Sequence, residues 1–343
     1  MTFTFTRIFI AGAAAAALLA TVPASAQEYT LRLHSFGSPT SLDHTAHLDR
    51  WAETVEEQSG GRIEVEVYPA MQLGGRASDL VQQLEDGVVD IIWTLPGFTP
   101  GRFPGAQGLE LPFMNTGKSA TMSPAAMEFI LGHLGKEFEG IKVIAVHATD
   151  GALIHTIDEP IEDLSDFEGK RLRVAGRFIG EAVKGLGATP VGIAFPEVYE
   201  ALSRNQVDGM LINWAITDPM RFYEVTSYHT DEPLYQSMLM TLMSQASYDK
   251  LPEDLQKVID DNSGIEYATR MGEIWDTATE PARQKAVGNG NTLVTLSAEE
   301  RAKWKEAVEP AYQAWIETMN EQGYDGEALF ATLQEITAKY GRE

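Results

Sequence analysis

A regular alternation of strand-like and helix-like segments constrains the fold of this chain more than any other sequence feature. Residues 29–36 (YTLRLHSF) alternate as a strand does, and residues 41–61 have the apolar periodicity of an amphipathic helix. The strands expected in this part are 29–36, 62–69, 87–96 and 142–148, with a second helix at about 77–87. This β-α-β-α-β order predicts an α/β domain whose binding crevice lies at the carboxyl ends of its strands.

A second unit of the same kind starts near Gly151. Its expected strands are 171–175, 189–193 and 207–212, and its expected helices are 178–186 and 195–206. Long helices then cover 251–288, a strand follows at 292–296, and a last helix opens with a capping box formed by Ser297 and Glu300. A chain of 343 residues with this repeated order is expected to form two domains.

The first 26 residues have the composition of a secretory signal peptide. Arg7 precedes an apolar run at 8–20, and residues 24–26 (ASA) form a small-x-small cleavage site. The mature chain is therefore expected to begin at Gln27 and to reside in the periplasm. No later segment reaches about 18 consecutive apolar residues, so we expect no direct membrane insertion of the mature chain.

The composition removes several classes of site. The chain has no cysteine, which excludes a disulfide framework, a thiolate nucleophile and a Cys-ligated zinc. Its formal net charge of -24 makes nucleic acid and anionic membrane surfaces poor partners. The motifs G-x-S-x-G, H-E-x-x-H, the P-loop and a post-strand G-x-G-x-x-G are missing, so we expect neither an enzyme nor a cofactor. A periplasmic hydrolase or isomerase on the same scaffold, or a ligand-free sensor, stays as the alternative.

Three other features have ordinary structural explanations, and we expect no metal site. His44 and His47 lie three apart on a predicted helix, but no third ligand is placed beside them, so a solvated helix face is expected. The acidic run 162–169 (EDLSDFEG) is expected to be a solvated loop rather than a catalytic carboxylate pair. Trp51 lies on the apolar stripe of its helix and is expected in the core.

Positive charge is concentrated in one predicted strand, residues 169–177 (GKRLRVAGR), of an otherwise acidic chain. Alternation places Arg171, Arg173 and Arg177 on one face of this segment. Arg173 lies between two apolar residues, near the strand end where ligand crevices form, and a guanidinium is suited to bidentate carboxylate binding. From the pattern alone, a carboxylate anchor and an ordinary surface ion pair are equally good interpretations of Arg173.

An ordered series of motifs resembles one transport family along almost the whole chain. The motifs are SGGRIEVEVYPAMQLGG (59–75), DGVVDIIWTLPGFTPGRFP (86–104), LELPFM (109–114), DFEGKRLRV (166–174), LGATPVGIAFPEVYEALSRNQVDG (186–209), FYEV (222–225) and LPEDLQKVIDD (251–261). Over residues 29–340 they resemble the periplasmic solute-binding subunit of tripartite ATP-independent periplasmic (TRAP) transporters of the DctP type. Single pieces such as SGGR are weakly specific, whereas the ordered set is highly specific.

This resemblance implies an α/β venus-flytrap protein with mixed sheets flanked by helices and with long connecting and C-terminal helices. Its two domains are expected at 27–150 plus about 238–277 and at 151–237 plus about 278–343. Such a protein captures an organic acid between its domains, without catalysis, and delivers it to membrane permease subunits. We expect a monomer, with a dimer as the alternative. In this family the arginine of the G-x-x-L/I-R-V motif binds the ligand carboxylate, which makes Arg173 the implied anchor.

Departures from the family pattern set the expectation for the ligand. Several positions that are polar in sugar-acid binders or in many other members of the family are apolar here, namely Phe36, Leu95, Leu153 and Ile212. The stacking aromatic of the family's F-x-E-V-Y motif is retained as Phe195, and Trp93 and Trp214 lie near the apolar positions. Such walls favour a monocarboxylate with an aromatic or otherwise apolar body, such as a benzoate. The polar groups that remain to bind ring hydroxyls or a second acid group are Thr94, His155, Arg177, Asn213 and Tyr235. Arg177 keeps a C4-type dicarboxylate as the alternative, with a sugar acid as a further one.

Overall fold

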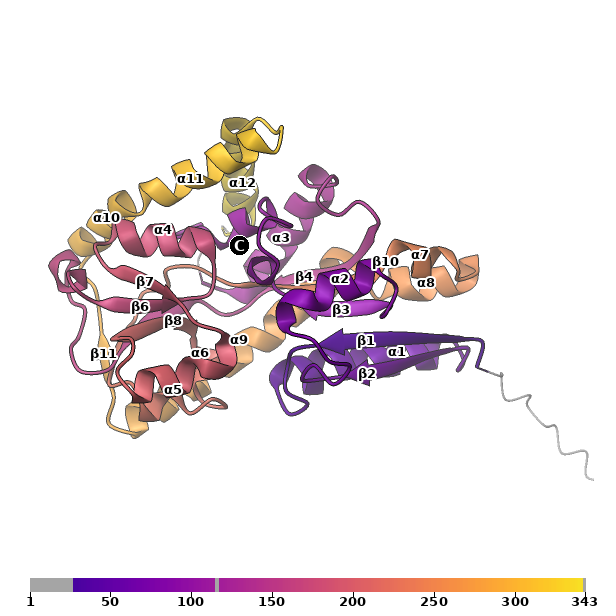
Figure 1. The fold of residues 1–343 in the computed structure, drawn as a ribbon, viewed down its shortest axis with the longest axis horizontal. Helices are drawn as coiled ribbons and strands as arrows, with labels where there is room; N and C mark the ends of the chain where they lie inside the picture. The colour runs from indigo at the N-terminus through magenta and orange to yellow at the C-terminus, as the bar shows by residue number, and fades with distance from the viewer. Residues whose placement is uncertain (1–26, 115–116, 342–343) are drawn as a thin grey trace, which may run out of the picture.

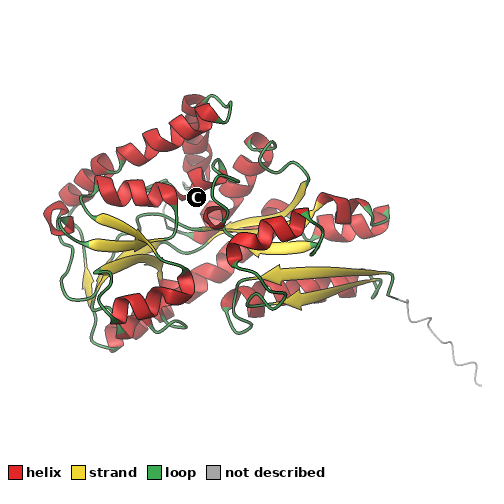
Figure 2. Ribbon diagram, viewed as in Figure 1, coloured by secondary structure: helices red, strands yellow, loops and turns green. Residues whose placement is uncertain are grey.

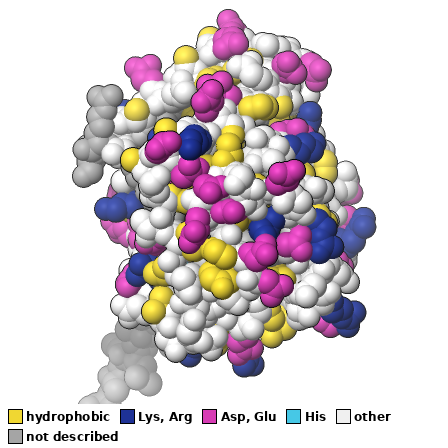
Figure 3. Space-filling view, turned by 90° about the vertical axis from the view of Figure 1, so that its left-hand side faces the viewer, with side chains coloured by type: hydrophobic (Ala, Val, Ile, Leu, Met, Phe, Trp, Pro, Cys, Tyr) yellow, Lys and Arg dark blue, Asp and Glu magenta, His cyan; other side chains and the backbone are white. Residues whose placement is uncertain are grey.

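The computed structural model describes residues 27–114 and 117–341, which form two mixed β-sheets flanked by helices (Figures 1 and 2). The predicted signal peptide, residues 1–26, lies outside the described residues. On the face drawn in Figure 3, acidic side chains are spread among fewer basic ones, in line with the net charge of -24.

The first sheet has five strands in the order β2-β1-β3-β10-β4. Their bounds are β1 (Tyr29–Ser35), β2 (Ile63–Tyr68), β3 (Ile91–Thr94), β4 (Ile141–Ala148) and β10 (Met238–Ser244). β1 pairs in parallel with β2 and β3, while β10 is antiparallel to β3 and β4. The four predicted strands are confirmed, and β10 is an addition that enters the sheet from the far end of the second unit.

The second sheet has six strands in the order β11-β9-β5-β8-β6-β7. Their bounds are β5 (Ala152–Thr156), β6 (Arg171–Val174), β7 (Thr189–Gly192), β8 (Gly209–Asn213), β9 (Tyr228–Thr230) and β11 (Thr292–Val294). β6 is parallel to both β7 and β8, as a βαβ unit requires, whereas β5 is antiparallel to β8 and β9. The predicted β6, β7, β8 and β11 are confirmed, while the short β5 and β9 were not expected.

Helices cover both sheets and join them. Those beside the first sheet are α1 (Asp49–Gln58), α2 (Leu80–Glu85), α3 (Ser119–His133), α7 (Gln245–Asp249) and α8 (Glu253–Asp261). Those beside the second are α4 (Arg177–Gly185), α5 (Val198–Ser203), α6 (Trp214–Thr217) and α10 (Ala298–Ala307). The long α9 (Gly264–Gly288) contacts α3 and β4 of the first unit and α6 of the second. At the C-terminus, α11 (Glu309–Glu321) packs on α4 and α12 (Gly326–Tyr340) packs on α3 (Figure 1).

The remaining elements of the described chain are short helical turns. They are η1 (Asp43–Leu48), η2 (Ala77–Asp79), η3 (Pro96–Phe98), η4 (Ala106–Glu110), η5 (Leu164–Phe167), η6 (Phe195–Glu197) and η7 (Phe222–Glu224). Ser297 caps α10 as predicted, because its hydroxyl accepts a hydrogen bond from the backbone N–H of Glu300 at 3.1 Å. Half of the capping box is absent, since the Glu300 carboxylate accepts from the N–H of Leu164 instead.

The core confirms one expectation about the first helix and contradicts another. Trp51 is buried, and its indole N–H donates to the carbonyl of Asn262 at 2.9 Å. The predicted solvated face of His44 and His47 is wrong, because both side chains are buried. His47 lies between the Tyr267 hydroxyl (2.7 Å) and the Thr241 hydroxyl (3.0 Å), on α9 and β10. These two elements come from about 190 to 220 residues later in the chain and cover the face that local periodicity left open.

Candidate functional site

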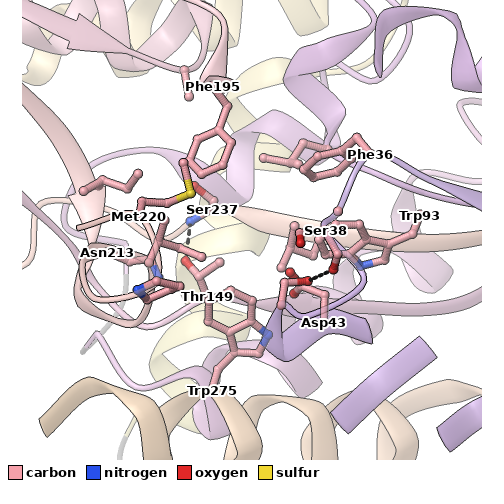
Figure 4. A pocket seen from close by; sticks show the side chains of 18 of the residues that line it. Phe36, Ser38, Asp43, Trp93, Thr149, Phe195, Asn213, Met220, Ser237 and Trp275 are labelled. Atoms are coloured by element: carbon pink, nitrogen blue, oxygen red, sulfur yellow. Dashed lines mark hydrogen bonds between the residues drawn. The ribbon is translucent and has the colours of Figure 1, made fainter. Parts of the chain in front are cut away.

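A cavity of about 220 Å³ lies where the carboxyl ends of parallel strands from both sheets meet. The segment after β1, the end of β3, Leu95 and the last residue of η3 form one wall, while the ends of β6 and β8 form the opposite wall. Trp275 of α9 contributes to the lining from the helix that spans both sheets (Figure 4). The location is the one that the alternating strand and helix pattern predicts for an α/β crevice.

Arg173 is the central feature of the second wall. It is 3 % exposed, and its Nε donates to the carbonyl of Ile193 at 3.1 Å. Among the described residues, no carboxylate lies close enough to pair with its guanidinium. Burial lowers the pKa of Arg173 from its ordinary value, and the nearby Tyr235 partly opposes this shift. A buried cation without a counter-ion is costly, so an anion entering the cavity would be strongly favoured there.

Arg171, two residues earlier on the same strand, provides the contrast. Its guanidinium forms two hydrogen bonds with the carboxylate of Asp208, at 3.1 and 2.8 Å, and a third with the carbonyl of Asn205. It is exposed to solvent at the opposite end of the strand from the cavity. The surface ion pair that the pattern allowed for Arg173 is therefore formed by its neighbour.

The walls around Arg173 are largely aromatic and aliphatic. Phe36 stacks on Trp93 with ring centroids 4.5 Å apart, and meets Phe98 edge-on at 4.9 Å. Phe195 and Met220 lie on the other side of the cavity (Figure 4). Leu95 and Ile212 also line the space. A planar apolar body held between these walls would bury its faces against rings, which offset and edge contacts favour.

Two predicted polar residues, Asn213 and Tyr235, line the cavity as well. The amide of Asn213 donates to one oxygen of Asp150, whose other oxygen accepts from the N–H of Ala215 at 3.1 Å. Burial is the main reason that the pKa of Asp150 rises to about 6. Asp150 thus fixes both the Asn213 side chain and the start of α6. Burial likewise raises the pKa of Tyr235 to about 12, so its phenol stays neutral and able to donate.

The structure places five of the predicted site residues outside the cavity lining: Thr94, Leu153, His155, Arg177 and Trp214. Thr94 alternates with Trp93 and Leu95, which face the cavity, so it points to the other side of β3. Arg177 begins α4, is exposed, and places its guanidinium over the ring of Phe178.

His155, Trp214 and Leu153 form a layer behind the second wall. The Nδ1 atoms of His155 and His229 are 2.6 Å apart, and His155 Nε2 is 3.0 Å from the carbonyl of Ile212. Trp214 packs edge-on against both imidazoles. Desolvation lowers the pKa of His155 to about 4, which keeps its ring neutral. Leu153 packs with Trp214 and α9. These residues support Ile212 and Asn213 from behind.

Sequence reasoning singled out none of the individual polar residues of the first wall. Ser38, Thr40, Ser41 and Asp43, in the segment after β1, all line the cavity. Asp43 is 5 % exposed, and burial raises the pKa of its carboxyl to about 7. The available signal was positional, since residues just past the carboxyl end of a parallel strand border the crevice of an α/β sheet.

Within residues 27–114 and 117–341, no group of three or more His, Asp or Glu side chains is arranged to hold a metal ion. No helix in the described part of the chain is long and apolar enough to cross a membrane.

A cavity between two α/β units, with a buried cation that has no carboxylate partner among the described residues, is typical of a solute-binding protein for anions. Residues 34–318 match the model of the bacterial extracellular solute-binding proteins of family 7, and the chain belongs to this family. The predicted resemblance to TRAP solute-binding subunits and the predicted two-domain α/β fold are thereby confirmed.

Known relatives of this chain differ in what they bind. A marine metagenome TRAP protein described as specific for aromatic acids, solved with meta-hydroxyphenylacetate, is 38% identical with a TM-score of 0.87, over 91% of this chain and 99% of that one. A TRAP protein of Rhodoferax ferrireducens, solved with copurified benzoate, is 36% identical with a TM-score of 0.86, over 91% and 98%. The C4-dicarboxylate-binding periplasmic protein DctP of Rhodobacter capsulatus is 27% identical over 96% of this chain and 97% of its own.

Proposed function

We propose that this protein captures an aromatic monocarboxylate between its two α/β units and delivers it to the permease of a TRAP transporter. The observation that carries the proposal is Arg173, a buried cation with no carboxylate partner among the described residues, in a cavity walled by Phe36, Phe195 and their neighbours. A benzoate-like ligand supplies what this site lacks, an anion at one end and a flat apolar body at the other. The relatives solved with benzoate and with meta-hydroxyphenylacetate support this choice.

The size and polarity of the cavity favour an aromatic acid over a sugar acid. Its volume of about 220 Å³ compares with the roughly 150 Å³ of an apolar cavity that takes up benzene. The hydroxyls of a sugar acid would face Leu95, Ile212 and aromatic rings, and each unpaired hydroxyl would cost on the order of 1–3 kcal/mol. An aromatic ring instead gains about 25 cal/mol for each Å² of apolar surface that it buries.

A dicarboxylate is the weaker candidate at this site. Arg177, the second cation that the sequence offered for it, lies outside the lining and over Phe178. A second carboxylate would thus meet the apolar wall without a cationic partner. We also propose a binding role without catalysis, because His155 and His229 bond to each other behind the second wall and His44, behind the first wall, bonds to the hydroxyl of Ser35.

Capture requires the two units to close on the ligand, and we propose the sequence-based domain limits for this motion. The first unit would comprise 27–150 plus about 238–277, and the second 151–237 plus about 278–343. The residues between 148 and 152, those between 230 and 238, and α9 connect the two sheets, so they would contain the hinge. Closure by hinge rotation about such connections is common in two-domain binding proteins. Export through the signal peptide would place the monomer in the periplasm beside its permease.

Isothermal titration calorimetry on the mature chain from Gln27 tests the proposal. The panel contains benzoate, hydroxyphenylacetates, a C4-dicarboxylate and glucuronate. We expect aromatic monocarboxylates to bind at least 100-fold more tightly than the other two classes, a difference of about 2.7 kcal/mol. Tighter binding of the dicarboxylate or the sugar acid would overturn the proposed ligand class and leave the role of Arg173 open to test by mutation.

A further inference from the structure

We propose that Asp43 recognises a hydroxyl substituent on the ring of the bound acid, so that ring-hydroxylated acids bind more tightly than alkylated ones of the same shape. The inference rests on the proposed function and assigns the part of the ligand that Arg173 does not hold. Asp43 belongs to the first unit and Arg173 to the second, so the two groups would grip the ligand from opposite walls.

The carboxyl group of Asp43 is buried against the cavity with unused hydrogen-bonding capacity. It opens η1, is 5 % exposed and lines the cavity. Its Oδ1 is buried without a hydrogen-bond partner among the described residues. In Figure 4 it lies with Ser38 and Trp93 on one side of the cavity, across from Phe195 and Met220. A buried polar atom without a hydrogen-bond partner has lost its bonds to water and gained none in return, unless a ligand atom bonds to it.

Other buried carboxylates in the protein are satisfied by the chain itself. Asp150 accepts from Asn213 and from the N–H of Ala215. Glu137 accepts from two backbone N–H groups at the start of η4, and Glu110 accepts from the N–H of Met238 at 2.9 Å. Each of these has a structural role that explains its burial. Asp43 is different because one of its oxygens has no such role.

The hydroxyls around Asp43 bond within their own loop, although Ser41 also lies close enough to Asp43 to lower the pKa of its carboxyl against the larger effect of burial. Ser41 Oγ donates to the carbonyl of Ser38 at 2.7 Å, and the Ser38 and Thr40 hydroxyls are 3.2 Å apart. The indole nitrogen of Trp93, on the same side, is in contrast a buried donor without a partner among the described residues. The wall therefore holds an acceptor at Asp43 and a donor at Trp93 that are buried and that no described residue uses. A hydroxyl is both a donor and an acceptor, so it can bond to either atom, whereas a methyl group can bond to neither.

The charge of Asp43 does not prevent an anionic ligand from binding beside it. Burial raises the pKa of Asp43 to about 7, so a large fraction of the molecules hold a neutral carboxyl near neutral pH. A neutral carboxyl can accept a hydrogen bond through one oxygen and donate through the other, without repelling an anionic ligand. The main influences on this carboxyl are its burial, its own backbone and Ser41, and Arg173 is not among them. The two groups are accordingly free to bind different ends of one ligand.

The test compares ligands that differ only by replacement of a hydroxyl with a methyl group. The pairs are 3-hydroxybenzoate with 3-methylbenzoate and 4-hydroxybenzoate with 4-methylbenzoate, titrated into the wild type, Asp43→Leu and Asp43→Ala. We expect the wild type to prefer the hydroxyl member of at least one pair by about tenfold, the contribution of one good hydrogen bond. Both variants should lose this preference while still binding the methyl member. Glu57→Leu, which removes an exposed carboxylate from neighbouring α1, should keep it.

The outcomes separate the inference from the proposed function. If the wild-type protein binds neither member of any pair, the proposed function and the inference about Asp43 are both overturned. If it binds both members equally, or if the preference persists in the two Asp43 variants, the inference alone is overturned. The wild-type ratio needs no variant, so it decides the question even if a substitution at Asp43 prevents folding.

Discussion

At the scale of the single residue, this protein shows how burial separates two identical side chains. Arg171 and Arg173 face the same way on one strand, yet Arg171 is solvated and paired with Asp208, while Arg173 is buried and has no carboxylate partner in the described part of the chain. A paired and exposed guanidinium contributes little to the stability of the fold or to binding. An unpaired and buried one remains only where another function requires it. Arg171 lies at the exposed end of the strand and Arg173 at the end that borders the cavity, and this difference in position accounts for the difference in burial.

Arg173→Ala is expected to weaken binding of benzoate or a hydroxybenzoate at least 100-fold, since it removes a charge-assisted and bidentate contact of about 3 kcal/mol or more. The affinity of Arg173→Lys for the ligand should lie between those of the wild type and Arg173→Ala, because a lysine keeps the charge but lacks the planar guanidinium group. Arg171→Ala is the matched control and should change the affinity less than about threefold, as expected for a surface pair. Calorimetric titration measures all three. Equal losses for the two alanine variants would contradict the assignment of the anchor.

Glu110 gives a pH-dependent prediction. Its carboxyl is buried, and desolvation raises its pKa to about 8, against the opposing effect of the Met238 N–H. A raised carboxyl pKa stabilises the fold fully below the unfolded pKa of about 4.3, and this contribution is lost as the pH rises through about 8. Glu110→Gln mimics the protonated form at every pH. Its Tm should therefore exceed that of the wild type by about 3 °C or more at pH 9, and the difference should largely vanish at about pH 4, below the unfolded pKa. A difference in Tm that does not depend on pH would contradict the buried titration.

At the scale of the element, segments late in the sequence bury elements from its N-terminal part. β10 enters the first sheet between β3 and β4, and α9 packs along α3. The contact between α3 and α9 is close at Gly272, where an added Cβ would lie 2.4 Å from the carbonyl oxygen of Ser119. Because that oxygen belongs to the backbone of α3, it cannot move aside cheaply. The glycine therefore sets the distance between the two helices.

Gly272→Ala should lower the free energy of unfolding by about 1–3 kcal/mol, since the methyl group forces α3 and α9 apart. Gly288→Ala, at the last residue of the same helix, has open space around its Cβ position and should leave stability equal or raise it by up to about 1 kcal/mol. Urea denaturation followed by circular dichroism measures both. The close packing would be disproved by a Gly272→Ala variant as stable as the wild type.

At the scale of the whole molecule, the cavity lies where strand ends of the two sheets meet beside α9. A ligand there contacts the segment after β1 and the segment after β8 at once, although these are about 170 residues apart in the sequence. Binding at 100 times the Kd would stabilise the folded protein by about 2.7 kcal/mol. This stabilisation should appear as slower opening on both sides of the cavity.

Hydrogen exchange with a saturating aromatic acid tests this bridging. We expect slower exchange in residues 36–43 of the first unit and in residues 211–220 of the second, with little change in α12, which lies away from the cavity lining. Slower exchange on one side only would mean that the ligand does not hold the two units together. The Arg173→Ala variant, with the same ligand concentration, serves as the unprotected control.

The apolar walls were predicted from departures from the family pattern, whereas the sequence by itself determined the alternation of strands and helices and the strand that positions Arg173. These features are local, because a period of 2 or 3.6 residues records which side of an element is buried. Only the tertiary structure decided which polar groups are buried and which of them face the cavity. His47 is enclosed by elements from about 190 to 220 residues later, Arg177 turns outward as its helix begins, and Asp43 closes the far wall. The burial of a polar side chain depends on partners that arrive from elsewhere in the chain, and local periodicity carries no record of them.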